Sequence, residues 1–460
     1  MAEVLDELNE IRSEAGPRLK LLPLIAACFF IVSGGPYGLE ELVAKSGYDR
    51  ALWILLLTPL IWSLPTAFAV AELSTALPDR GGYYIWVRRA LGPFWGFQEA
   101  WLSLAASFFD MALYPTLFVL YLGQLVPALG TGVPAFAIGL GFIAAGALWN
   151  VAGAGAVGKS SVLFALAILG PFAAMVGLAF VHPAAPPIAP VQTGGLMAGV
   201  LVAMWNYMGW DNAATFANEV ERPQRVYPRA ILGTLALVTL VYLLPVLAAR
   251  RAGLAASGWT AGAWASAGAA IAGPWLGVAI VGGGMLCAFG MFNSLVLSYS
   301  RLPVAMADDG LLLAVLGKLA PRTGAPWVSI LVCAVGYACC LGLGFDKLVQ
   351  LDIVLYGLSL ALEFVALVAL RITEPALARP FRVPGGLPGV IALGVPPVVL
   401  LVAALGASFT DPEAGGAAGL KLAAALIAAG PVLYVWSRGG ALRLQPRSLR
   451  VREGGRGAPQ

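Results

Sequence analysis

Long apolar segments recur along the whole chain, and they constrain its fold more than any other feature. Twelve of them reach or approach the roughly 20 residues that a helix needs to cross the hydrocarbon core of a bilayer. Only 11% of the 460 residues are charged, whereas about a quarter are charged in an average soluble domain. We therefore expect an all-α polytopic membrane protein with twelve transmembrane helices. The predicted spans are residues 19–45, 50–77, 94–126, 134–152, 158–181, 195–219, 228–249, 274–304, 326–343, 347–371, 387–408 and 418–437.

The first span is interrupted by residues that disfavour a helix. The segment Ser33–Pro36, which reads SGGP, follows an apolar run, and a second short helix can resume at Tyr37. Inside a bilayer, an unwound segment leaves N–H and C=O groups without partners unless protein or a water-filled cavity satisfies them. A broken apolar helix therefore indicates a binding site within the membrane.

A second break falls in the sixth predicted span, where residues 205–211 read WNYMGWD. Asn206, Gly209 and Asp211 interrupt an apolar run near its middle. Two interrupted helices, in corresponding positions of two five-helix halves, are typical of an inverted-repeat transporter with its site between them. Two unrelated kinks could give the same spacing, but the number of spans and the distribution of charge favour the repeat. We expect the two breaks to face each other.

The distribution of basic residues predicts the orientation. If both ends lie in the cytoplasm, the inner segments collect 22 lysines and arginines and the outer segments collect six. The net charge of +4 then reflects these loops, and no nucleic-acid partner is needed to explain it. We expect a multi-pass protein of the cell membrane with four parts. These are a cytoplasmic N-terminal segment (1–18), a transport core of ten helices (19–371), two further helices (372–437) and a basic cytoplasmic tail (438–460).

Several carboxylates fall inside predicted spans, where an ionisable side chain is costly and is a functional candidate by default. Asp110 lies more than halfway across the third span, with Tyr114 one turn later on the same face. It could instead only accept hydrogen bonds from a neighbouring broken helix. Glu363 shares a face of the tenth span with Tyr356, and a packing or snorkelling role for Glu363 has equal weight. Glu72, near the inner face, is expected either to belong to a gate or to pair with a loop arginine.

Four motifs, in this order, resemble those of the amino acid-polyamine-organocation superfamily. They are SGGPYGLEE in the first span, AELSTALPDRGGYYIWVRRALGP after the second, NEVERPQRVYPRAI after the sixth and YSRLPVAMADDGLL after the eighth. Within it, the chain most resembles the plant and protozoan polyamine uptake transporters. The shared features are SGGPYG with a following Glu, WD at the second break, DxALYP at Asp110–Pro115, LEFxAxxxLR at Leu362–Arg371 and ARPFRVP at Ala378–Pro384. The resemblance implies the leucine-transporter fold with its 5+5 inverted repeat, alternating access, and uptake driven by a proton gradient.

The chain departs from its proton-coupled relatives at one point. Several of them carry a lysine in the middle of helix five that stands in for a sodium ion, whereas Lys159 is at the inner end of that span here. If transport is coupled to protons, a carboxylate must therefore bind the proton. Coupling to sodium is the alternative. The candidates for the coupled proton are Asp110, Asp211, Glu40 and Glu363.

The residues of the first break predict a pocket that is better suited to a cation than to an anion. Pro36 has no N–H to offer an amino acid carboxylate at the start of the second half-helix, and Glu40 and Glu41 lie close to that start. Asp110 and Asp211 add negative charge, and neighbouring aromatic rings can make cation–π contacts. The alternative is that both glutamates face the outer loop and bind only water or a lysine.

We therefore expect a secondary active transporter for polyamines or cationic amino acids, with a co-transported cation, a proton ahead of sodium, as its second small partner. A neutral amino acid permease of the same fold, and a sensor that binds amines or amino acids without transport, are the alternatives. We expect no enzymatic activity, cofactor or metal, because neither the five cysteines nor the single His182 has ligand spacing. The chain is expected to be a monomer or a homodimer. The predicted substrate-binding residues are Ser33, Gly34, Gly35, Tyr37, Glu40, Asp110, Tyr114, Trp205, Asn206, Tyr207, Trp210, Asp211, Asn293 and Tyr356. The predicted gate or structural residues are Glu72, Glu219 and Arg222.

Overall fold

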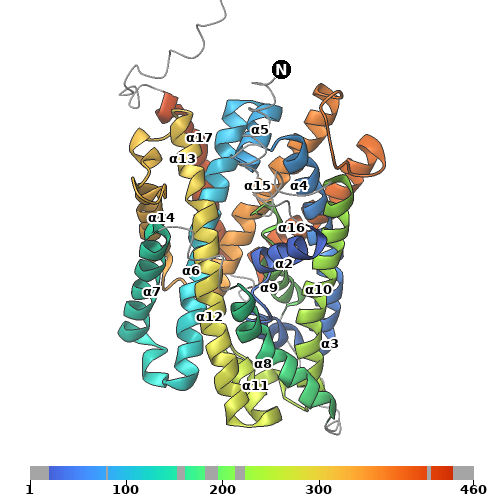
Figure 1. Ribbon diagram of the computed structural model, residues 1–460, viewed down its shortest axis with the longest axis vertical. Coiled ribbons are helices and arrows are strands. Elements are labelled where there is room, and N and C mark those ends of the chain that lie inside the picture. Colours follow the sequence, from blue (N-terminus) through green and yellow to red (C-terminus); the bar gives the residue numbers. More distant parts are fainter. Residues whose placement is uncertain are drawn as a thin grey trace, which may run out of the picture.

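The computed structural model describes residues 20–78, 81–152, 161–181, 195–212, 223–411 and 416–438. In this part of the chain every regular element is helical, and the helices form a bundle (Figure 1). The α-helices are α2 (Leu21–Val32), α3 (Glu40–Thr58), α4 (Leu64–Ala76), α5 (Tyr83–Leu91), α6 (Pro93–Leu125), α7 (Gly132–Ala152), α8 (Ser161–Val181), α9 (Leu196–Asn206), α10 (Pro223–Arg251), α11 (Ala263–Ala272), α12 (Pro274–Tyr299), α13 (Arg301–Asp308), α14 (Trp327–Cys340), α15 (Phe345–Thr373), α16 (Gly386–Thr410) and α17 (Gly416–Arg438). A π-helical turn, η1 (Pro59–Ser63), joins α3 to α4, and the short 3-10 turns are η2 (Pro127–Leu129), η5 (Ala256–Gly258) and η6 (Ala314–Gly317).

Eight segments of the described chain are long and apolar enough to cross a bilayer. They are Glu40–Ala76, Pro93–Leu125, Gly132–Ala152, Gln224–Arg251, Pro274–Asp308, Phe345–Thr373, Gly386–Thr410 and Gly416–Arg438. Each coincides with a predicted span, so the all-α polytopic membrane protein expected from the sequence is confirmed. The other four predicted spans correspond to α2, α8, α9 and α14, which are not among these eight segments; in α8, the described apolar stretch is Ala167–Val181.

The first predicted break is present, and glycine makes it possible. α2 ends at Val32, and the helix resumes at Glu40, three residues later than the predicted start at Tyr37. The delay arises because Gly35 and Gly38 adopt φ values of 99° and 90°, a region that disrupts a right-handed helix. A further glycine, Gly47, kinks α3 with φ 67° between the first and second predicted spans.

The second predicted break is also present and lies beside the first. α9 ends at Asn206, and Gly209 takes a φ of 92°. A Cβ on Gly209 would stand only 3.4 Å from the carbonyl oxygen of Ile31, at the end of α2. The hydroxyl of Tyr242 on α10 donates to the carbonyl of Asn206 (2.9 Å), which satisfies one C=O group that the break leaves free. The two breaks therefore adjoin, as the spacing predicted.

Three short helices lie between the long ones. α5 and α13 lie at one end of the bundle, and α11 lies at the opposite end (Figure 1). α5 is amphipathic, because Tyr83, Tyr84, Trp86 and Val87 are buried while its arginines are not. α11 and α13 were not predicted, since each is too short to give a long apolar period.

α6 and α15 form the centre of the bundle. α6 packs most extensively against α15 and α12, and these contacts bring together residues about 250 and about 180 positions apart in the sequence. α16 and α17 pack against the outside of this centre and keep most of their apolar surface exposed, as expected for helices that face lipid. The polar residues considered below are therefore positioned mainly by α6 and α15.

Candidate functional site

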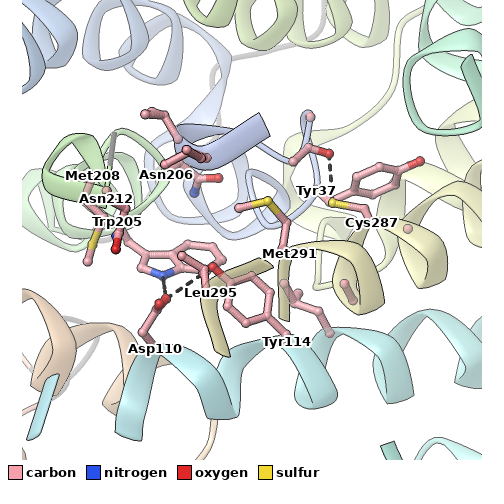
Figure 2. A pocket seen from close by; sticks show the side chains of 18 of the residues that line it. Tyr37, Asp110, Tyr114, Trp205, Asn206, Met208, Asn212, Cys287, Met291 and Leu295 are labelled. Atoms are coloured by element: carbon pink, nitrogen blue, oxygen red, sulfur yellow. Dashed lines mark hydrogen bonds between the residues drawn. The ribbon is translucent and has the colours of Figure 1, made fainter. Parts of the chain in front are cut away.

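A small cavity lies where the two breaks meet (Figure 2). Water-sized molecules can enter about 50 Å³ of it, which leaves room for a few water molecules. The predicted site residues in its lining are Gly34, Gly35, Tyr37, Asp110, Tyr114, Trp205 and Asn206. Gly209 of the second break also lines it, and the lining residues that the sequence did not single out are Ile31, Val32, Leu117, Met208, Asn212, Tyr242, Gly284, Cys287, Ala288, Met291, Leu295 and Tyr299.

Asp110 is the only acidic residue in this lining, and among the described lining residues none is basic. Its side chain is 3% exposed. Oδ1 accepts hydrogen bonds from the Trp205 indole N–H (3.2 Å) and the Tyr114 hydroxyl (3.4 Å), and Oδ2 accepts one from the Tyr299 hydroxyl (3.2 Å). Figure 2 shows the Trp205 indole directed at the carboxylate. The carboxylate thus has three neutral donors and, in the described part of the chain, no ion pair.

The main chain of the first break offers more acceptors than donors to the cavity. The N–H of Gly35 already donates to the Ser33 hydroxyl (3.2 Å), and the N–H of Gly38 donates to Glu40 Oε2 (2.7 Å). α2 and α9 both end at the cavity, and the last carbonyl groups of a helix carry partial negative charge. The site is therefore arranged for a positively charged ligand group.

Cys287 and Met291 pack α12 against the first break. The Cys287 thiol donates to the carbonyl of Gly34 (2.8 Å), and a Cβ on Gly34 would overlap the sulfur atom. Tyr37 reaches across the neighbouring glycines of α12 and donates to the carbonyl of Ile280 (3.2 Å). The three consecutive glycines at 282–284 were the one signal in the sequence that another chain segment approaches α12 here.

Glu40 and Glu41 do not line the cavity. Glu40 is fully buried and accepts hydrogen bonds from the N–H of Gly262 (3.1 Å) and from the Tyr121 hydroxyl, while Glu41 accepts one from the N–H of Ala261 (3.1 Å). This placement is close to the alternative drawn from the sequence, in which both face an outer loop. Their observed partners, however, include main-chain N–H groups of the segment before α11, so the start of α3 is fastened to that segment.

A second group of buried acids lies outside the cavity lining, and we call it the acidic cluster. It consists of Glu99 on α6, Asp211 after α9, and Asp352 and Glu363 on α15. The charge of Asp211 interacts with those of the other three. Tyr356 donates to Asp211 Oδ1 (2.8 Å), so these two predicted residues meet here and not in the cavity. The snorkelling role considered for Glu363 is excluded, because its side chain is 2% exposed. Glu99 and Asp352 were not among the predicted candidates.

The remaining predicted binding residues hold the helices together at other places. Tyr207 donates to the carbonyl of Leu55 (2.9 Å), and the indole N–H of Trp210 donates to the carbonyl of Tyr207 (3.1 Å). Asn293 accepts a hydrogen bond from the amide of Asn150 (2.9 Å), which links α12 to α7. Ser33 lies in the first break but not in the lining. The residues considered from the sequence that lie outside the described part of the chain are Lys159, His182, Glu219 and Arg222.

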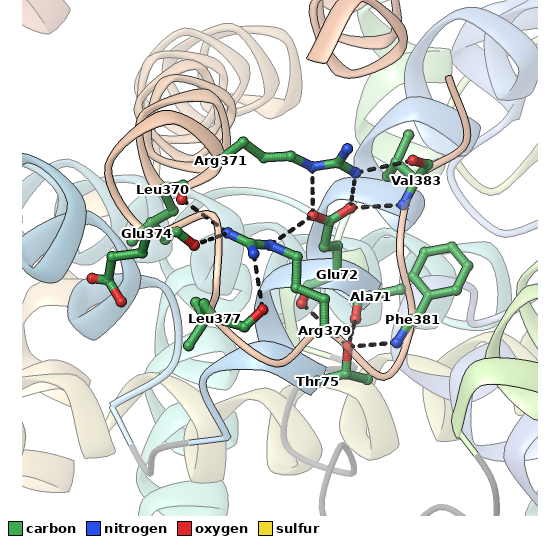
Figure 3. Close-up of polar contacts among 10 residues, drawn as sticks. All are labelled: Ala71, Glu72, Thr75, Leu370, Arg371, Glu374, Leu377, Arg379, Phe381 and Val383. Carbon is green, nitrogen blue, oxygen red and sulfur yellow. Dashed lines mark hydrogen bonds and ion pairs between the residues drawn. The ribbon is translucent and has the colours of Figure 1, made fainter. Parts of the chain in front are cut away.

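Glu72 pairs with two arginines at the end of the bundle that carries α5 (Figure 3). Its carboxylate accepts from Arg371 Nε (2.8 Å) and Nη2 (2.5 Å), from the N–H of Val383 (2.6 Å), and lies 3.3 Å from Arg379. The structure thus places Glu72 in a buried ion-pair network that fastens α4 to α15 and to the loop that follows α15. This matches the pairing with an arginine that the sequence offered as one alternative.

Two further ion pairs fasten α5 to its neighbours. Arg89 forms a bidentate pair with Glu374 (2.9 and 2.7 Å), just beyond α15. Arg88 and Tyr84 both bind Asp309, at the end of α13. These contacts fasten α5 to α13 and to the segment after α15 at one end of the bundle, while Glu40 and Glu41 fasten α3 to the segment before α11 at the other end.

Comparison with known proteins gives one consistent family. The family model described as amino acid permease matches residues 25–433. The polyamine transporter RMV1 of Arabidopsis thaliana is 36% identical over 391 residues, which cover 84% of this chain and 79% of that protein. The polyamine transporter PUT1 of Oryza sativa subsp. japonica is 36% identical over 393 residues, covering 85% of this chain and 74% of that protein. The serine/threonine exchanger SteT of Bacillus subtilis is 26% identical over 393 residues, covering 82% of this chain and 88% of that protein. The chain therefore belongs to the amino acid permease (APC) family of integral membrane transporters.

Proposed function

We propose that this protein is a secondary active transporter that imports polyamines or cationic amino acids by alternating access. In this proposal the chain has the leucine-transporter fold, with twelve transmembrane helices, a 5+5 inverted repeat within residues 19–371 and two further helices in 372–437. Both ends lie in the cytoplasm of a cell that carries the protein in its cell membrane. The observation that carries the proposal is Asp110, a buried carboxylate that faces the cavity between the two breaks without a basic partner among the described residues.

The chemistry around Asp110 favours an ammonium group over a carboxylate. A substrate carboxylate needs free donors, but two N–H groups of the first break are already bonded and Pro36 has none. An ammonium group finds the Asp110 carboxylate, the carbonyl ends of α2 and α9, and the rings of Tyr114 and Trp205 for cation–π contact. Two of the relatives named above carry the name polyamine transporter, and this likeness supports our proposal of polyamines ahead of cationic amino acids.

The proposed coupling ion is a proton, carried by a buried carboxylate. The described residues contain several carboxylates in the interior of the bundle, and burial disfavours the charged form of such groups. Sodium coupling is the alternative and predicts uptake that depends strictly on sodium.

Two other functions are kept as alternatives. A neutral amino acid permease is favoured by the likeness to a serine/threonine exchanger, and in that case the amino group of the substrate would meet Asp110. A sensor of the same fold would bind its ligand without moving it. Accumulation of labelled substrate inside proteoliposomes separates both permeases from the sensor.

The test of the proposed substrate is binding to Asp110→Asn. Removing one partner of a buried, hydrogen-bonded charge pair typically costs about 2–5 kcal/mol, and each 1.4 kcal/mol is tenfold in affinity. We expect the purified wild-type protein to be stabilised against heat by putrescine and spermidine, and Asp110→Asn to bind them about thirtyfold or more weakly.

The matched control is Asp346→Asn, because Asp346 is partly exposed at the start of α15 and pairs with Lys45 (2.9 Å). This variant should keep wild-type affinity. A wild-type protein that is stabilised by alanine or leucine and not by putrescine or spermidine would refute the amine proposal in favour of the neutral amino acid permease.

A further inference from the structure

Asp352 is a fully buried carboxylate without a hydrogen-bond partner. Its side chain is 0% exposed, and neither Oδ1 nor Oδ2 has a partner among the described residues. In the same acidic cluster, Asp211 accepts from Tyr356 (2.8 Å) and Glu99 accepts from Ser359 (2.6 Å). Glu99 and Glu363 each have one buried carboxylate oxygen, Oε2, without a partner among the described residues, whereas both carboxylate oxygens of Asp352 are buried and without one.

The groups that face Asp352 are acids and tyrosines. Its charge interacts with Asp110 and Tyr114 on α6, with Asp211 after α9, and with Tyr299 on α12. Asp110 belongs to the cavity lining and Asp352 does not, so Asp352 lies outside the lining of the cavity to which we assign the ammonium group. A like charge beside a carboxylate further disfavours its ionised form.

Among the described residues, no basic side chain of the other helices packed against α15 is paired with Asp352. α9 and α16 contain no titratable residue. The two arginines of α5 bind Asp309 and Glu374, and the network of Glu72 binds Arg371. The lysine and the arginine of α17 are exposed at the surface of the bundle.

An isolated carboxylate ion away from water is much less stable than the neutral acid. We infer that Asp352 is the residue that binds the co-transported proton, next to the ammonium site at Asp110 but separate from it. This inference rests on the proposed function, because it assigns a residue to the proposed proton coupling.

Coupling then follows from the cost of burying uncompensated charge. Before the carrier closes, a proton from the outer solution forms an O–H bond with Asp352 while the ammonium group of the substrate compensates Asp110. After the carrier opens to the other side, that O–H bond breaks and the proton passes to water as the amine leaves. Closing around an ionised Asp352 is disfavoured, because its charge would be buried without a partner. The proton and the cationic amine therefore cross together, and transport is electrogenic.

Uptake by Asp352→Asn tests the assignment, because asparagine keeps the shape of the side chain and cannot release a proton. Purified protein is placed in proteoliposomes at a clamped membrane potential. Labelled putrescine uptake is measured with and without an inward proton gradient, and a pH-sensitive dye reports the interior. We expect the gradient to raise wild-type uptake and putrescine to acidify the wild-type vesicles. Asp352→Asn should take up putrescine equally with and without the gradient, with no acidification, and with an affinity within about threefold of wild type.

Two variants control for folding and for local charge. Asp346→Asn, on the same helix, should keep the full wild-type response to the gradient, because Asp346 is paired and partly exposed. Asp352→Glu restores a titratable group, so it should keep gradient-driven uptake and acidification even if Asp352→Asn does not purify as folded protein.

The outcomes separate the proposals. If Asp352→Asn responds to the gradient as the wild type does, or if Asp352→Glu loses the response that Asp346→Asn keeps, Asp352 does not carry the proton. A loss of putrescine affinity of about tenfold or more in Asp352→Asn assigns the residue to ammonium binding instead and overturns the inference. A wild type that takes up putrescine without any proton response overturns the coupling, and with it this inference, while leaving the amine substrate in place. A wild type that does not bind putrescine refutes the substrate itself.

Discussion

Gly38 illustrates how one residue without a side chain determines the geometry around Asp110. Its φ is 90°, and a Cβ at this position would stand 2.8 Å from Cζ3 of Trp205. The indole N–H of Trp205 donates to the Asp110 carboxylate, so displacing the indole would break this hydrogen bond. The residue therefore affects both the stability of the first break and the cavity.

We predict that Gly38→Ala lowers the free energy of unfolding by roughly 1–3 kcal/mol, the cost of a strained backbone conformation, and also weakens putrescine binding. Thermal unfolding with and without putrescine measures both effects. The control is Gly282→Ala on α12, where a Cβ meets no atom within 4 Å and the backbone is helical, so stability should be kept or slightly raised. A Gly38→Ala protein as stable as the wild type would contradict the close contact.

At the scale of residues, the sequence predicted what depends on local chemistry. Asp110 was identified because a carboxylate inside an apolar span is rare and costly, and the structure places it in the cavity. Tyr299, which donates to it from α12, could not be paired with it, because that contact depends on how α6 and α12 pack. The same holds for Asp352 and Glu99, whose interactions with Asp211 depend on the packing of α15.

At the scale of elements, glycine and proline explain why the broken helices were predictable. Glycine and proline in Ser33–Pro36, and glycine at position 209, have low intrinsic helix propensity, which does not depend on how the rest of the chain packs. The length of a broken segment was less predictable, since the helix resumes only after the positive φ of Gly38. α11 was missed because ten residues rich in alanine give no long apolar period, and its position depends on contacts with α12 and with the start of α3.

The network around Glu72 joins three elements and carries the prediction at this scale. The side chains of Glu72 and Arg371 are 0% and 2% exposed, and removing one partner of a buried ion pair typically costs about 3–5 kcal/mol. We expect Glu72→Gln to lower the unfolding temperature clearly while leaving the residues of the cavity unchanged. Glu374→Gln, which removes the exposed partner of Arg89, should change the unfolding temperature little. Equal effects of the two substitutions would argue against a special role for the buried network.

At the scale of the whole molecule, the helices are fastened at the two ends of the bundle by different kinds of contact, and we propose that these contacts are the two closures of the cavity. On the α11 side, the carboxylates of Glu40 and Glu41 bind main-chain N–H groups. On the α5 side, arginines bind Asp309 and Glu374. A transporter that works by alternating access opens one closure while it keeps the other. Under the proposed orientation, the α11 side faces the outside.

This arrangement predicts where reagents can reach Cys287, a thiol of the cavity lining. Glu40→Ala leaves the N–H groups of Gly38 and Gly262 and the Tyr121 hydroxyl without their acceptor, and each unsatisfied buried donor costs about 1–3 kcal/mol. The substitution should weaken the contacts that we propose close the outer end, because it destabilises the closed form, in which Glu40 accepts these hydrogen bonds, more than a form that is open to the outside. We expect a membrane-impermeant thiol reagent, added outside to a Cys339→Ser background, to modify Cys287 about tenfold or more faster in Glu40→Ala.

The matched control for this prediction is Asp49→Asn. Asp49 pairs with Arg250 (2.8 Å) near the same end of the bundle, but both side chains are largely exposed, so the rate of Cys287 modification should stay at the wild-type value. Saturating putrescine should slow the reaction in Glu40→Ala, since a bound amine at Asp110 occupies the space that the reagent must cross. Faster modification from the inner side, with none from outside, would reverse the proposed orientation. No acceleration from either side would mean that the contacts of Glu40 do not hold the cavity closed.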